Sequence, residues 1–234
     1  MKITTLLFPA FVAILFSSVS IPEVKVSGAM KNIMMKGDLN AYANLDTLPK
    51  MNLYAIGPIE GLKGEAVILN GEIYSSQKID NKIINGKGKV SKMAMLVYSY
   101  VENWEAFVVS AKVSNYTELE ALISQTAKQN GYDITMPFAF KIEAKPQSVN
   151  YHIIDWKTGV NHTMENHKQF AFSGKSQNSN ATFLGFYSDH HQSVFTHHTT
   201  NMHVHVLDEK SKNVGHLDDI KVNSMITIYL PKLK

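Results

Sequence analysis

The sequence contains no cysteine and no arginine among its 234 residues. Without cysteine the chain has no disulfide bond and no thiolate, so any bound metal ion must be held by histidine and carboxylate side chains. Without arginine every fixed positive charge belongs to lysine, and no guanidinium group can bind a substrate carboxylate through two parallel hydrogen bonds. Both absences restrict the chemistry that a site in this protein can perform.

The chain also lacks a strong charge imbalance and has only one long apolar run. Its formal net charge is +3 and its lysines form no cluster, so we expect no nucleic-acid partner. The apolar run follows Lys2 and ends at the small residues Ser18-Val19-Ser20, which is typical of a secretory signal peptide over residues 1–20. We therefore expect a secreted or periplasmic protein without a stable membrane anchor, with an uncleaved anchor as the alternative.

The remaining residues, 21–234, are sufficient for one domain with a substantial core, or for two halves at 21–135 and 136–234. Short apolar runs bounded by turn residues predict many strands, whereas only two or three segments have a helical pattern. Because the strands cluster rather than alternate strictly with helices, the sequence predicts a strand-dominated α+β fold.

The clearest helix follows a capping box formed by Thr117 and Glu120 and stops at Gly131. Two segments rich in polar residues and glycine, 81–89 and 174–180, contain no clear period. We expect both to be loops, and the second to be the more flexible.

Two histidines alternate with valine near the end of the chain, so the side chains of His203 and His205 lie on one face of a strand. The segment that follows is polar in the middle and apolar at its ends, which predicts a hairpin. A symmetric hairpin centred between Lys210 and Ser211 places His205 opposite His216. Three imidazoles with a fourth position left open are typical of a catalytic zinc site, with surface histidines on a hairpin as the alternative.

One acidic residue occupies an unusual position. Glu65 opens a strand that ends at the hairpin turn Asn70-Gly71, and it shares a strand face with Val67 and Leu69. A carboxylate on an apolar face beside glycines is either a strand-end residue that points to solvent or a buried functional acid. Both interpretations remain open from the residues alone.

A further group of histidines precedes the His203 strand: His190, His191, His197 and His198. We interpret them as exposed loop residues. A second, weaker metal patch and the lining of a site entrance are the alternatives.

Three groups of segments resemble the α-acetolactate decarboxylase family, and the likeness extends from about Val26 to Ile220. The first group is residues 182–188 with His203-Val204-His205 and Gly215-His216-Leu217-Asp218. The second is Gly61-Leu62-Lys63-Gly64-Glu65 with Asn70-Gly71 and Tyr74. The third is Gln129-Asn130-Gly131 followed by residues 138–142. The resemblance implies two mixed halves built on β-sheets, usually in a homodimer. It also implies that His203, His205 and His216 bind Zn²⁺ and that the Glu65 carboxylate reaches the metal site.

The chain departs from that family at two positions. The family has an arginine near the substrate carboxylate, one strand after the segment 138–142, and His152 occupies that position here. The family also draws a glutamate from its C-terminal tail, whereas the residues up to Lys234 contain no matching acid. The resemblance therefore implies a complete zinc site within an altered substrate-binding shell.

The function implied by the resemblance is that of a zinc-dependent lyase with a small-molecule substrate. Acetolactate, a 2-hydroxy-3-oxo acid, would lose carbon dioxide and give acetoin, with Zn²⁺ stabilising the charge left behind. Glu65 is the candidate acid/base, and His152, if protonated, would steady the departing carboxylate in place of arginine.

Two alternatives belong to other classes. The spacing His203-x-His205-x-x-x-Glu209 imitates that of cupin metal enzymes, in which the glutamate is a ligand. The other alternative is a zinc-dependent binding or sensing protein that has lost the arginine. A decarboxylase would have the Glu65 carboxylate beside the histidines, whereas a cupin-like enzyme would have that of Glu209.

Overall fold

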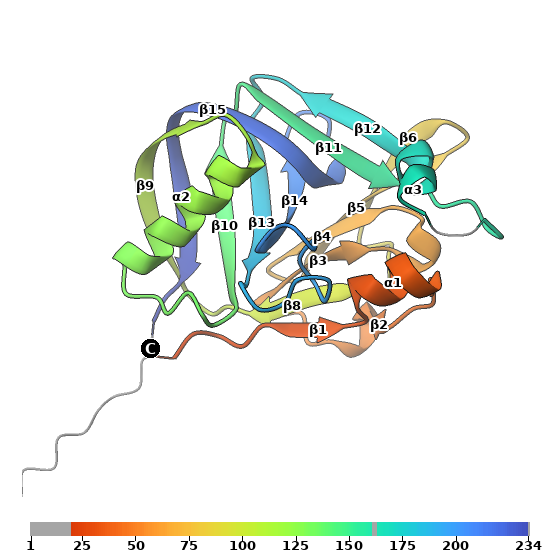
Figure 1. Ribbon diagram of the computed structural model, residues 1–234, viewed down its shortest axis with the longest axis horizontal. Coiled ribbons are helices and arrows are strands. Elements are labelled where there is room, and N and C mark those ends of the chain that lie inside the picture. Colours follow the sequence, from red (N-terminus) through yellow and green to blue (C-terminus); the bar gives the residue numbers. More distant parts are fainter. Residues whose placement is uncertain (1–19, 161–162, 234) are drawn as a thin grey trace, which may run out of the picture.

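Two large β-sheets form most of the structure, a computed structural model that describes residues 20–160 and 163–233 (Figure 1). The predicted signal peptide, residues 1–20, lies outside the described residues except for Ser20. The prediction of a strand-dominated α+β fold is confirmed. Within the described ranges, no helix combines the length and the apolar character needed to cross a membrane.

The first sheet has six antiparallel strands in the order β1-β8-β3-β4-β5-β6. Its strands are β1 (Lys25–Ser27), β3 (Leu53–Pro58), β4 (Glu65–Leu69), β5 (Glu72–Ile79), β6 (Lys82–Lys87) and β8 (Leu96–Tyr100). Asn70-Gly71 joins β4 to β5 in a two-residue turn, as predicted, because Leu69 pairs with Glu72 and both turn residues have positive φ. A separate two-stranded sheet consists of β2 (Ala43–Asn44) and β7 (Lys92–Met93).

The prediction of a loop over 81–89 was wrong, because β6 occupies most of this segment and pairs with β5. The turn between these strands contains Asp80 and Asn81, with φ of 50° and 59°, a left-handed conformation that Asp and Asn tolerate. β6 is an edge strand with few buried side chains. Its lysines and asparagines therefore resemble a loop in sequence although its backbone is extended.

The second sheet contains the remaining strands, and its longest strand pairs with four others. Its members are β9 (Trp104–Val113), β10 (Phe138–Ala144), β11 (Ser148–Ile154), β12 (Ala171–Ser176), β13 (Ala181–Tyr187), β14 (Met202–Asp208) and β15 (Val214–Pro231). β15 pairs with β14 and β11 along its first half and with β10 and β9 along its second half. Because β10 also pairs with β13, and β13 with β14, the strands β10, β13, β14 and β15 close into a ring.

The helices are short except for α2 (Tyr116–Gln129), which packs beside β9 and β15 (Figure 1). Its N-cap is Asn115, whose side chain accepts a hydrogen bond from the backbone N–H of Glu118, while the Glu118 carboxylate accepts one from Ser114 N–H. The cap thus lies two residues before the predicted Thr117. The other helical elements are α1 (Met30–Lys36), α3 (Met164–Phe170) and the 3₁₀ turns η1 (Leu45–Thr47) and η2 (Glu60–Leu62).

A second predicted loop also needs correction. Residues 171–176 form β12, which pairs with β11, so only residues 177–180 of the predicted loop 174–180 connect strands. Gly174 is needed in this strand because a Cβ there would lie 2.3 Å from ring carbons of Tyr151. This close approach explains why the strand has a glycine at this position, although a glycine in the sequence suggested a flexible segment.

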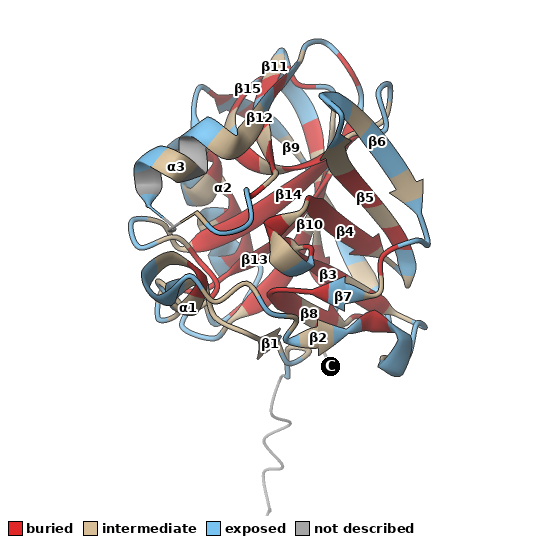
Figure 2. Cartoon of the chain, turned by 90° about the vertical axis from the view of Figure 1, so that its right-hand side faces the viewer, coloured by how far each residue is buried: buried red, intermediate tan, exposed pale blue. Residues whose placement is uncertain are grey.

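The layer between the two sheets is buried and apolar, and it positions the site described below. Val67 of β4 belongs to the same buried cluster as Ile154 of β11, Leu207 of β14 and Val214 of β15. Figure 2 shows these strands as largely buried, with exposed residues concentrated on β6 and the outer helices. Because side chains alternate along a strand, residues two positions from these four also face the layer.

Candidate active site

The histidine hairpin forms as the sequence predicts, from β14 and β15. His205 pairs directly with His216 across the two strands. His203 lies two residues before His205 and therefore on the same face. That face is the one directed toward the layer between the sheets, because Leu207 and Val214 share it.

The three imidazole rings lie close together. Ring centroids are 5.0 Å apart for His203 and His205, 5.0 Å for His203 and His216, and 5.7 Å for His205 and His216. Nε2 of His203 lies 3.2 Å from Nε2 of His205. Both of these residues are buried, whereas the side chain of His216 is 25% exposed. The hairpin thus brings three ring systems to one point with access from one side.

The first sheet orients one of these rings. Nδ1 of His205 lies 2.9 Å from the backbone carbonyl oxygen of Ala66 in β4. A carbonyl oxygen only accepts hydrogen bonds, so Nδ1 donates and Nε2 of the neutral ring keeps its lone pair. Metal-binding histidines commonly have this arrangement, with one nitrogen fixed by a backbone carbonyl.

Glu65 is buried beside the histidines and does not point to solvent. Oε2 of Glu65 lies 3.5 Å from Nε2 of His205, and the residue is 3% exposed. Burial raises the pKa of Glu65 to about 8, because the charged carboxylate loses its hydration inside the protein. At neutral pH and without a cation nearby, Glu65 is therefore a proton-carrying acid.

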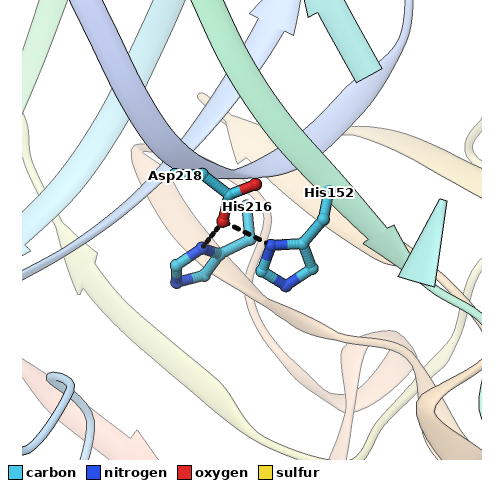
Figure 3. Close-up of side chains that lie close together, drawn as sticks. All are labelled: His152, His216 and Asp218. Atoms are coloured by element: carbon cyan, nitrogen blue, oxygen red, sulfur yellow. Dashed lines mark hydrogen bonds and ion pairs between the residues drawn. The ribbon is translucent and has the colours of Figure 1, made fainter. Parts of the chain in front are cut away.

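A fourth histidine and an aspartate extend the group on the far side of His216 (Figure 3). His152 of β11 pairs with His216, and their ring centroids are 4.8 Å apart. The register between β11 and β15 shifts at this point, since Asn150 pairs with Asp219 while Tyr151 pairs with Leu217. Asp218 is the extra residue of this β-bulge, and bulges of this kind reorient side chains beside functional sites.

Asp218 forms a short contact with His152. Its Oδ1 lies 2.6 Å from Nδ1 of His152 and 3.9 Å from Nδ1 of His216. Burial alone would raise the pKa of Asp218, but the hydrogen bond with His152 lowers it overall. In the same way, burial opposes the charged form of His152, yet the Asp218 hydrogen bond raises the pKa of His152 above its usual value. The pair therefore favours an ionised carboxylate beside a protonated imidazole.

The other three histidines of the cluster, His203, His205 and His216, favour the neutral form instead. Burial, followed by the proximity of His216, lowers the pKa of His203 and of His205 well below the usual value. Burial also lowers the pKa of His216, although Asp218 partly opposes this. Neutral imidazole is the form that binds metal ions, so these residues fit a divalent cation with nitrogen preference such as Zn²⁺.

A second ligand set shares one of these residues. His152, His216 and Asp218 each offer one ligand atom, and these atoms lie within 4.8 Å of one another. The close hydrogen bond between His152 and Asp218 already satisfies two of them. Burial favours the neutral form of His203, His205 and His216, so these three form an alternative set of candidate ligands.

The cluster borders a cavity of about 500 Å³. Glu65, His152, His203, His216 and Asp218 lie in its wall, together with apolar residues from α1 and neighbouring segments. His197, from the loop between β13 and β14, also lines it. A small molecule in this cavity can thus reach His203, His216 and Glu65 together.

Comparison with known proteins supports the family suggested by the motifs. Residues 28–233 match the model of the family described as alpha-acetolactate decarboxylase. The chain belongs to this family. No protein of curated function matches the sequence significantly.

Solved structures with the same fold include α-acetolactate decarboxylase from Bacillus subtilis strain 168, with a TM-score of 0.73 and 16% identity over 90% of this chain and 86% of that one. A Staphylococcus aureus protein of unknown function, similar to α-acetolactate decarboxylase, has a TM-score of 0.71 and 17% identity over 90% of this chain and 85% of that one. At this level of identity the similarity concerns the fold.

In this structure the carboxylate beside the histidines is that of Glu65 and not that of Glu209. Glu209 lies at the hairpin turn, where it forms an ion pair of 2.6 Å with Lys212 and accepts a hydrogen bond from Thr182. This position removes the basis of the cupin-like interpretation, which required Glu209 near His203 and His205.

Sequence reasoning missed two residues of the site. Asp218 follows His216 by two positions, a spacing that suggests a shared face, but its contact with His152 depends on the bulge. For His197 the exposed-loop interpretation is wrong and the alternative, the lining of a site entrance, is closer, because this residue is half-buried and lines the cavity. His190 and His198 are exposed, as expected. No local signal distinguishes His197 from His198, because the path of the loop decides which one faces the cavity.

Proposed function

We propose that the protein is an exported, zinc-dependent decarboxylase of 2-hydroxy-3-oxo acids, with acetolactate as the reference substrate and acetoin as its product. The observation that carries this proposal is that His203, His205, His216 and the buried acid Glu65 lie together beside one cavity, whose wall includes His203, His216 and Glu65. Family membership supports the reaction class.

His203, His205 and His216 would hold the metal ion. Burial keeps these imidazoles neutral, and the Ala66 carbonyl fixes the ring of His205 with its Nε2 lone pair directed to the cluster. Bound Zn²⁺ would act as a Lewis acid toward the oxygen atoms of the substrate. The surrounding apolar layer buries His203 and His205, which strengthens electrostatic interactions around them.

Glu65 is suited to the proton transfer. When the bond to the carboxyl carbon breaks and carbon dioxide leaves, the electron pair passes toward the neighbouring ketone group, and the reacting carbon then needs one proton. Burial raises the pKa of Glu65, which favours the protonated form that can give this proton. Solvent would restore the proton after product release.

His152 is suited to bind the substrate carboxylate. Its hydrogen bond to Asp218 favours the protonated ring, which places a positive charge in the cavity wall of a chain without arginine. An imidazolium provides only single hydrogen bonds, so it would hold a carboxylate less tightly than a guanidinium.

The test is to mix the purified, zinc-loaded mature protein with racemic acetolactate and measure acetoin. We expect acetoin formation above the spontaneous rate for wild-type protein and catalysis that is weaker by about 10²-fold or more for Glu65→Gln. Acetoin formation at the spontaneous rate in both samples would instead favour a zinc-dependent binding or sensing protein. This is the second candidate function because His152 replaces the arginine. N-terminal sequencing of the exported protein tests the signal peptide, with a start just after Ser20 as the expected result.

A further inference from the structure

The cavity beside the histidines has two kinds of wall. Most of its polar groups come from β4, β11, β14 and β15, namely Glu65, His152, His203, His216 and Asp218, and the others are Ser173 of β12 and His197 of the loop before β14. In contrast, α1 contributes only apolar side chains, those of Met30, Ile33 and Met34. Leu62, Met95 and Ile154 add to the apolar part.

The apolar wall is a fixed part of the fold. Residues 30, 33 and 34 have the spacing of one helix face, and Ile33 is buried in the layer between the sheets. The start of α1 is tied to the loop that carries His197, because the N–H groups of Met30 and Lys31 donate hydrogen bonds of 2.8 and 2.9 Å to the carbonyls of Val194 and Ser193. Met30 and Met34 are half-buried, whereas the neighbouring Met35 is 83% exposed.

Acetolactate is too small to use this wall. It carries only one methyl group on each of its two central carbons, whereas a cavity of about 500 Å³ is in the range that holds much larger ligands. Bound acetolactate would leave part of the cavity, and therefore part of its apolar lining, in contact with water. A ligand with a longer apolar substituent would displace that water and gain the free energy of burying its own carbon atoms.

We propose that the preferred substrate is a 2-hydroxy-3-oxo acid in which one methyl group of acetolactate is replaced by an apolar chain of three or more carbons that packs against Met30 and Met34. This inference rests on the proposed function and extends it to the class of substrate. Methionine suits such a wall because its flexible, polarisable side chain adapts to apolar groups of different shape.

The experiment uses a series of 2-hydroxy-3-oxo acids in which one substituent at a time is lengthened from methyl to pentyl, with the zinc-loaded mature protein. We expect kcat/KM to rise by about fourfold for each added methylene until the cavity is filled, the factor that corresponds to about 0.8 kcal/mol per buried CH₂. A kcat/KM that is highest for acetolactate and falls with every added methylene would overturn the inference and leave the proposed function intact.

Binding of unreactive ligands separates the two proposals. Calorimetry with 2-hydroxy ketones of increasing chain length, starting from acetoin, requires no turnover. If no acid is decarboxylated, the proposed function fails, but tighter binding of the longer 2-hydroxy ketones would still support the apolar subsite. Equal or weaker binding of the longer ligands would overturn it.

A matched pair of variants locates the subsite on α1. Met34→Ala should reduce the preference for the longest over the shortest ligand at least threefold, whereas Met35→Ala should leave it unchanged because Met35 points to solvent. Ala171→Leu narrows the cavity from β12 and should selectively weaken the longest ligands. The same preference in wild type and in both Met34→Ala and Ala171→Leu would refute the assignment.

Discussion

Oδ1 of Asp218 lies 2.6 Å from Nδ1 of His152, and this contact joins a bulged residue of β15 to the opposing strand β11. The pair lies in the cavity wall next to His216 (Figure 3). In a chain without arginine, this contact favours a positive charge on His152, beside the candidate metal ligands.

Replacing Asp218 by asparagine tests that role. In metal-free protein, Asp218→Asn should lower the pKa of His152, because the carboxylate hydrogen bond and charge that raise it are lost. NMR titration of the His152 ring protons measures the change. Asp189→Asn is the control, since Asp189 forms a 3.4 Å ion pair with the exposed His190 away from the cluster. An equal pKa of His152 in wild type and Asp218→Asn would contradict the assigned contact.

The two sets of metal ligands can be distinguished by stoichiometry. His203→Ala, His205→Ala and His216→Ala should each lower bound zinc from about one ion per chain to a small fraction, because only two of the three ligands remain. Asp218→Asn should retain zinc, and His198→Ala, which alters an exposed histidine, is the control. Elemental analysis after dialysis measures the content. Loss of zinc in Asp218→Asn with retention in His203→Ala would favour the set of His152, His216 and Asp218.

Removal of the acid should separate metal binding from chemistry. Glu65→Gln keeps the size and polarity of the side chain but cannot give a proton, so zinc content should be unchanged and kcat should fall by about 10²-fold or more. Acetoin formation and elemental analysis of the same sample provide the measurement. Full turnover in Glu65→Gln would remove this residue from the reaction.

The raised pKa of Glu65 has a consequence for the stability of the metal-free protein. In the unfolded chain the carboxyl loses its proton above about pH 4.3, whereas in the folded protein it keeps the proton up to about pH 8. Folding therefore takes up a proton between these values, and raising the pH lowers the contribution of Glu65 to the free energy of unfolding.

Glu65→Gln has no such proton to take up, so its stability relative to wild type should increase with pH. From pH 5 to pH 7.5 we expect the difference to grow by on the order of 3 kcal/mol, at about 1.4 kcal/mol per pKa unit. Urea unfolding in the presence of a chelator measures it, and histidine titrations common to both proteins cancel in the comparison. A difference that does not change with pH would mean that Glu65 is ionised in the folded protein.

Gly215 should be essential for the position of the histidine hairpin. A Cβ at this residue would lie 2.4 Å from Cδ2 of Tyr151 and 2.8 Å from the carbonyl oxygen of His152, so β15 must move away from β11 to accept it. Gly215→Ala should lower the free energy of unfolding by about 1–3 kcal/mol and weaken zinc binding. Ser211→Ala, at the turn of the same hairpin, is the control. Wild-type stability and zinc affinity in Gly215→Ala would contradict the close approach.

The sequence alone determined the local geometry of the site. The alternation of side chains placed His203 and His205 on one face, and the polar segment after them fixed the hairpin that pairs His205 with His216. The two-residue turn at Asn70-Gly71 was equally local, because few residues other than Asn and Gly adopt its dihedral angles. Such features depend only on neighbours along the chain and are readable without a structure.

The tertiary structure decided which surfaces meet. Whether Glu65 faced solvent or the interior depended on the packing of β4 against β14, since a strand has two faces and its sequence does not state which is covered. The contact between His152 and Asp218 depended on a bulge that shifts the register by one residue, and the role of His197 depended on the path of a loop. Long-range packing fixes these relationships, because Glu65 meets the histidines only when the two sheets close on each other, and His152 meets Asp218 only when β11 pairs with β15.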